Sequence, residues 1–148
     1  MAKQAAVLML GFGILAANSA RAAEKLPVDA PRHVGGIESV CTGIGLDSRQ
    51  DSRWQSYPLK VELAGQGGQY LGDVAVTISR DGKDVVSVQC DGPWFLFRLS
   101  PGRYQIQAET EGRTVRSMAF VPTTGQGRTI LRFSDLGGQR TTEPATPP

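Results

Sequence analysis

Few residues of this chain could support catalysis or bind a metal ion. Among its 148 residues are one histidine, His33, and two cysteines, Cys41 and Cys90. A Ser-His-Asp or Cys-His arrangement would have to use His33, which lies close to two glycines in a stretch without regular periodicity. A zinc site needs three or four closely spaced ligands. We therefore predict no catalytic residue, no metal site and no cofactor; a hydrolase that uses His33 is the least favoured alternative.

The acidic and glycine-rich segments do not form a recognisable site either. Asp81 and Asp84 lie in or beside a turn, where acidic residues are expected for local backbone reasons. Asp47 and Asp51 lack the alternating oxygen ligands and the closing glutamate of an EF-hand. The loop Gly65–Gly68 follows a strand pattern but leads into no helix and no Lys-Ser/Thr pair, so it is not typical of a phosphate-binding loop.

The N-terminal segment is typical of a secretory signal peptide. Lys3 supplies a positive charge, Ala5–Ala17 is an apolar run too short to span a bilayer comfortably, and small residues follow. We predict that residues 1–22 are a signal peptide cleaved after Ala22. The mature protein would then be periplasmic or secreted, without stable membrane insertion.

The charge of the mature chain argues against nucleic-acid binding. The full chain has 16 Lys and Arg residues against 14 Asp and Glu residues. Cleavage removes Lys3 and Arg21, which leaves 14 basic residues and a net charge of zero. A nucleic-acid surface needs an excess of basic side chains, so no nucleic-acid partner is expected.

The expected oxidising compartment and the presence of two cysteines favour a disulfide between Cys41 and Cys90. Two cysteines that enter an oxidising compartment pair by default. They stand 49 positions apart, and closing such a loop contributes roughly 4 kcal/mol in the chain-entropy model.

The apolar pattern predicts an all-β fold. From Tyr57 onward, short alternating segments are separated about every ten residues by turn signals such as Asp81-Gly82 and Pro101-Gly102. We predict a seven-stranded antiparallel β-sandwich over residues 57–136. Residues 23–56 are expected to form an irregular arm with at most a short helical turn, and residues 137–148, poor in apolar residues, a disordered tail.

The central segment Cys90–Ala108, CDGPWFLFRLSPGRYQIQA, resembles the signature of carboxypeptidase regulatory-like domains. It has an acidic-glycine turn, an aromatic-rich strand, Leu-x-Pro-Gly-x-Tyr and an alternating strand. The resemblance implies a prealbumin-like or immunoglobulin-like sandwich and no catalytic residues of its own. It also implies structural roles for Pro101, Gly102 and Tyr104 in the turn: the glycine permits it, and the tyrosine ring is buried while its hydroxyl bonds the backbone.

Binding is therefore the predicted role of this module. The first hypothesis is a non-catalytic secreted or periplasmic module that binds another envelope protein through a sheet edge or an aromatic patch. The alternative is binding of a carbohydrate or a small apolar ligand by exposed aromatic side chains. The aromatics without an evident inward position, and hence the candidate binding surface, are Trp54, Tyr57, Tyr70 and Trp94. The competing interpretation is that Trp94 and Trp54 are buried.

Overall fold

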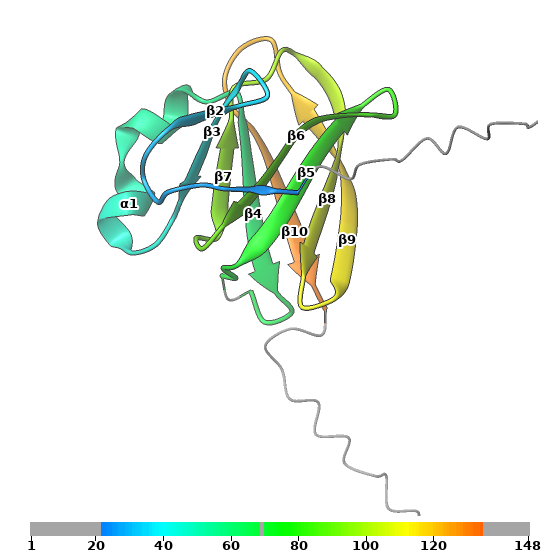
Figure 1. Cartoon of the computed structure of the whole chain (residues 1–148). Coiled ribbons are helices and arrows are strands. Elements are labelled where there is room, and N and C mark those ends of the chain that lie inside the picture. Colours follow the sequence, from blue (N-terminus) through cyan, green and yellow to red (C-terminus); the bar gives the residue numbers. More distant parts are fainter. Residues whose placement is uncertain (1–21, 69, 135–148) are drawn as a thin grey trace, which may run out of the picture.

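The computed structural model describes residues 22–68 and 70–134, which form ten strands in two five-stranded sheets (Figure 1). The predicted signal peptide up to residue 21 and the predicted tail lie outside the described residues. The strand order in the first sheet, sheet A, is β1-β6-β5-β8-β9, and in the second, sheet B, β10-β4-β7-β3-β2. The strands of sheet A are β1 (Glu24–Lys25), β6 (Lys83–Cys90), β5 (Val74–Arg80), β8 (Gly102–Thr110) and β9 (Arg113–Val121). Those of sheet B are β10 (Gly127–Phe133), β4 (Leu59–Gly65), β7 (Trp94–Phe97), β3 (Ile37–Thr42) and β2 (Arg32–Val34).

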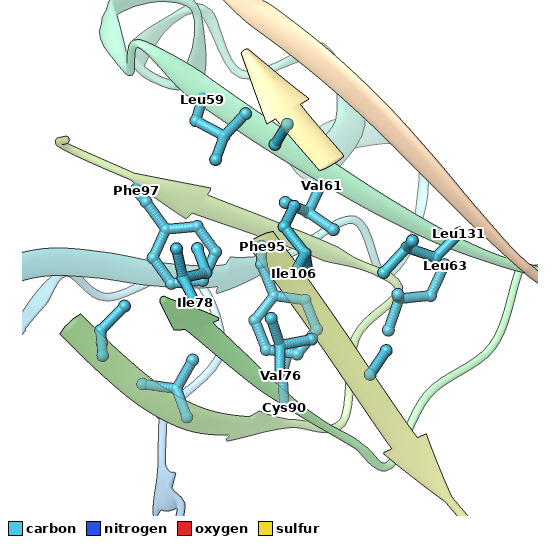
Figure 2. Packing of buried hydrophobic residues seen from close by; sticks show 14 of the residues in the cluster. Leu59, Val61, Leu63, Val76, Ile78, Cys90, Phe95, Phe97, Ile106 and Leu131 are labelled. Carbon is cyan, nitrogen blue, oxygen red and sulfur yellow. The ribbon is translucent and has the colours of Figure 1, made fainter. Parts of the chain in front are cut away.

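The main core lies between the two sheets and is built mostly from alternate side chains of the longer strands (Figure 2). Sheet A contributes residues such as Val76, Ile78 and Ile106, all essentially inaccessible to solvent. Sheet B contributes Phe95 and Phe97, whose stacked rings have centroids 6.1 Å apart. Each such buried side chain stabilises the fold by about 1.5–3 kcal/mol relative to an exposed one.

The predicted β-rich architecture is present, but the strand count and the antiparallel assignment are wrong. There are ten strands and not seven, because residues 23–56, expected to be an irregular arm, contain β1, β2 and β3. Two pairings are parallel, β1 with β6 and β10 with β4. Both parallel strands stand where the chain crosses between the sheets. The chain passes from β1 in sheet A to β2 in sheet B, and from β9 in sheet A to β10 in sheet B. The predicted helical turn is present as α1 (Leu46–Gln50) and the 3₁₀ helix η1 (Ser52–Ser56).

The segment Trp94–Leu99 is apolar on both faces, which predicts a central or interdomain-facing strand. The structure has a central strand there. β7 lies between β4 and β3 in the middle of sheet B. The predicted Asp81-Gly82 hairpin turn joins β5 and β6, with φ angles of 52° and 75°. The sequence of Thr114–Val121 leaves open whether Met118 and Phe120 or Val115 and Ala119 face inward. In β9, Ala119 and Val121 face the core while Met118 and Phe120 face solvent.

The Pro101-Gly102 turn has the contacts that the sequence suggests. The Tyr104 hydroxyl donates a hydrogen bond to the carbonyl of Ser100 at 2.7 Å, and its ring is buried. Arg80 donates from Nη1 to the same hydroxyl at 3.1 Å. Gly102 has a φ of 140°, a conformation that L side chains rarely adopt.

We expect Gly102→Val to lower the free energy of unfolding by about 1 kcal/mol or more, because a β-branched residue is strained at this φ. An added Cβ would also lie 2.5 Å from Nη2 of Arg80. Urea denaturation measures the loss, and repeating it in an Arg80→Ala background separates backbone strain from the side-chain clash. An unchanged unfolding midpoint would refute the strained turn.

Candidate functional site

The two cysteines form a disulfide that joins the two sheets. Cys41 lies in β3 of sheet B and Cys90 at the end of β6 in sheet A, with Cα atoms 5.5 Å apart. Both residues are fully buried. The predicted pairing is confirmed. Since the chain has only these two cysteines, no thiol remains to act as a nucleophile with His33.

Three of the four predicted binding aromatics are buried, and two of these, Trp54 and Tyr57, pack together. Their exposures are 4% and 3%, and with Val40 and Leu96 they form a second, smaller core on the outer face of sheet B. Their ring centroids are 6.2 Å apart, and Trp54 Nε1 donates to the carbonyl of Ser48 at 3.0 Å. The segment α1–η1 therefore covers part of sheet B with these two rings.

The other two aromatics, Tyr70 and Trp94, form a separate pair. Their rings meet edge to face with centroids 6.1 Å apart. Trp94 is only 7% exposed and has the ammonium group of Lys60 3.3 Å from its ring centroid, whereas Tyr70 is 46% exposed and has the guanidinium of Arg49 over its ring. The four aromatics thus do not share one exposed surface. A ligand-binding role for them stays a prediction, and only Tyr70 presents substantial surface.

His33 faces a carboxylate on the outer face of sheet B. The Oε2 atom of Glu38 lies 4.0 Å from His33 Nε2. Glu38 also accepts a hydrogen bond from the Tyr57 hydroxyl at 2.5 Å and pairs with Arg98. The Tyr57 hydroxyl is the main cause of a lowered pKa of Glu38. Burial, followed by the interaction with Glu38, raises the pKa of Tyr57 to about 12.

Glu62 is a buried carboxylate that the sequence did not single out. It is 4% exposed and forms ion pairs with two basic residues: Oε1 lies 3.0 Å from Lys60 Nζ, and Oε2 lies 2.6 Å from Arg128 Nη2. Burial alone would raise the pKa of Glu62, but the hydrogen bonds from Arg128 and Lys60 outweigh it and the pKa lies below its ordinary value of 4.5. The three charges join neighbouring strands β4 and β10, which is a structural role.

The lowered pKa of Glu62 predicts acid sensitivity of the fold. Because the folded state holds the ionised form more strongly than the unfolded chain does, this stabilisation is complete above about pH 4.5 and is lost as pH falls through the folded pKa. We expect Glu62→Gln to unfold more easily at neutral pH and to lose less stability than wild type between about pH 5 and pH 3. Denaturation curves across this range, with the exposed Glu109→Gln as control, measure both effects. Parallel pH profiles for wild type and Glu62→Gln would contradict the prediction.

The outer face of sheet A is open and carries two features that sequence reasoning missed. One is a polar trough of about 580 Å³, lined by residues such as Asp73, Thr77 and Glu109; none of the described residues that line it is aromatic. The other is the exposed apolar pair on β9, Met118 at 49% and Phe120 at 62%. In Figure 1 the yellow strand β9 lies on the opposite side of the molecule from the cyan α1. The large side chains of β9 point outward and the small ones inward. The sequence alone left open which of these two sets faces the core.

Comparison with protein-family models finds no match, and neither does comparison with curated proteins. Within residues 22–68 and 70–134, no group of three or more His, Cys, Asp or Glu side chains is arranged to hold a metal ion. Over the same residues no helix has the length and apolar character needed to cross a membrane.

Proposed function

We propose that this chain is a non-catalytic β-sandwich module, secreted or located in the periplasm, that binds a protein of the cell envelope through strand β9. The observation that carries the proposal is the combination at β9 of a sheet edge and two exposed apolar side chains, Met118 and Phe120. Exposed apolar side chains on the edge strand of a sheet are typical of interaction sites, because such side chains are unfavourable in water unless a partner covers them.

Two further observations support the proposed class and location. The inter-sheet disulfide suits an oxidising compartment. The turn contacts of Gly102 and Tyr104 are those expected for the Leu-x-Pro-Gly-x-Tyr motif, which supports a resemblance to carboxypeptidase regulatory-like domains. In that family the domain accompanies catalysis without performing it, and we propose the same accessory role here.

Carbohydrate binding by the aromatic residues has weaker support. A stacking site needs exposed ring faces, and of the four predicted aromatics only Tyr70 is substantially exposed. One face of that ring already carries the Arg49 guanidinium, 5.1 Å from its centroid.

Site-specific photo-crosslinking in the native envelope tests the protein-binding proposal. We expect a photoreactive residue at position 120 to give a discrete adduct with another polypeptide. The matched control is position 46, since Leu46 is equally exposed at 64% but lies on α1, away from β9. Adducts of equal yield at both positions, or none at position 120, would refute the proposal.

A further inference from the structure

The indole N–H of Trp94 is a buried hydrogen-bond donor that the fold does not use. Trp94 is 7% exposed, and no atom of residues 22–68 and 70–134 accepts a hydrogen bond from its Nε1. Leaving a buried donor unpaired is unfavourable, and native proteins do so rarely. The other tryptophan follows this rule, since Trp54 Nε1 donates to the carbonyl of Ser48. The Trp94 N–H is therefore a candidate donor to a bound ligand.

Three residues enclose the Trp94 ring on the outer face of sheet B. Gly43, which follows β3, packs so closely that an added Cβ would lie 2.8 Å from the ring. Lys60 comes from β4, on the opposite flank of β7, and its Nζ lies 3.3 Å from the ring centroid. With both faces of the indole covered in this way, Tyr70 meets it at an edge. Of the three, Tyr70 is the exposed one, so it is the neighbour that can move aside.

The carboxylate beside Trp94 is already engaged with two cations. Glu62 stands opposite Trp94 in the pairing of β4 with β7. Its Oε1 pairs with Lys60 at 3.0 Å and its Oε2 with Arg128 at 2.6 Å. Two cations and one carboxylate leave this group with a net positive charge. An anion brought to Trp94 is therefore attracted by its surroundings, whereas a cation is repelled.

Arg49 adds further positive charge at the same corner of sheet B. Its Nε donates to the carbonyl of Gly43 at 3.1 Å, and its guanidinium carbon lies 5.1 Å from the Tyr70 ring centroid. In the described part of the chain no carboxylate forms an ion pair with Arg49, and its two Nη groups donate to no acceptor. The Nη groups of a guanidinium can bind one carboxylate or phosphate with two parallel hydrogen bonds.

We propose that Trp94, Arg49 and Tyr70 form a binding site for an oxyanion, the carboxylate or phosphate group of a ligand. One oxygen of the anion accepts a hydrogen bond from Trp94 Nε1, and the Arg49 guanidinium pairs with its charge. Because Nε1 has almost no exposed surface, the Tyr70 ring turns away from the edge of the indole when the anion enters. The site lies on sheet B, whereas β9 belongs to sheet A, so the inference goes beyond the proposed function and does not depend on it.

Nuclear magnetic resonance of the two indole N–H groups tests the site in the mature protein labelled with nitrogen-15. We expect the Trp94 indole signal to shift saturably with inorganic phosphate or acetate between about 1 and 50 mM, the range of a single ion pair with hydrogen bonds. Sodium chloride at equal ionic strength should cause no shift, and the Trp54 signal should stay constant because its N–H is bonded to Ser48. Saturation with only one of the two anions identifies the group that the ligand carries. A Trp94 signal that neither anion moves, or that chloride moves equally, overturns the proposal.

Matched variants test the roles of Arg49 and Tyr70. We expect Arg49→Gln to weaken anion binding about fivefold, since it removes the charge that faces the anion. Arg53→Gln is the control and should bind like wild type, because Arg53 also lies over an aromatic ring, that of Trp54, but in η1. Equal affinities of the two variants would overturn the assignment of Arg49. Tyr70→Ala should speed hydrogen exchange of the Trp94 indole and not of the Trp54 indole; an unchanged rate at Trp94 would overturn Tyr70 as the cover.

Discussion

Removing the disulfide by Cys41→Ala/Cys90→Ala should lower the free energy of unfolding by about 4 kcal/mol and the melting temperature by roughly 15 °C. The bond closes a loop of 49 positions, and opening it restores that conformational freedom to the unfolded chain. The loss is a large share of the 5–15 kcal/mol that stabilises a typical domain.

The location of the bond gives it a second effect, on the association of the sheets. It is one covalent link between sheet B at β3 and sheet A at β6, and both sulfurs are in the main core. We therefore expect β3 and the short strand β2 beside it to exchange amide hydrogens faster in the double variant than the rest of sheet B does.

Chemical denaturation with and without reductant measures the disulfide prediction. Wild type under reducing conditions should unfold at nearly the same urea concentration as the double variant, while the double variant should be indifferent to reductant. A loss below about 1 kcal/mol would mean that the unfolded chain is already compact between the two cysteines.

The strands that the sequence revealed are those with polar and apolar residues in strict alternation. β5 alternates buried and half-buried positions along Val74, Val76 and Ile78, because one face meets the core and the other meets solvent. β6 ends a hairpin whose Asp-Gly turn has a backbone requirement that few residue pairs meet. Local pattern and tertiary structure agree there, so the prediction succeeded.

The strands that the sequence did not reveal depend on contacts distant along the chain. β3 is buried on both faces, with Cys41 in the main core and Val40 under Trp54, so its sequence IESVCT shows no alternation. β1 and β2 have no strand signal of their own and exist because β6 and β3 offer partners. Parallel pairing of β10 with β4 is equally non-local.

The candidate site was predictable to a smaller degree. The disulfide could be predicted from the expected oxidising compartment and the presence of two cysteines. The burial of Trp54 and Tyr57 could not, because it depends on how α1–η1 folds back on sheet B. The exposure of Phe120 could not be read from β9, because Val115 and Ala119 alternate with Met118 and Phe120 and both sets are apolar. In the structure the smaller set faces inward, with Ala119 in the main core and Val115 packed against it.

Trp54→Ala should lower the free energy of unfolding by about 3–5 kcal/mol, the usual cost of truncating a buried tryptophan. The ring covers Val40 and Leu96 on the outer face of sheet B, and its backbone carbonyl accepts a hydrogen bond from Gln126 at 2.7 Å. Removing the ring exposes this small core and releases the Nε1 hydrogen bond to Ser48. A surface tryptophan used for ligand stacking would instead leave stability nearly unchanged.

Two matched variants separate burial from binding. Trp54→Phe keeps most of the ring packing but not the hydrogen bond, so we expect a loss of about 1–2 kcal/mol. Tyr70→Ala removes an aromatic ring of which nearly half is exposed and should cost less than Trp54→Ala. Thermal and urea unfolding of the three variants should therefore rank Trp54→Ala as by far the most damaging.

If Trp54→Ala unfolds like wild type, the outer core does not hold α1–η1 against sheet B, and Trp54 returns to the set of candidate binding residues. Any loss of ligand binding in Trp54→Ala has meaning only at temperatures where that variant is still folded, which makes the stability measurement the one to perform first.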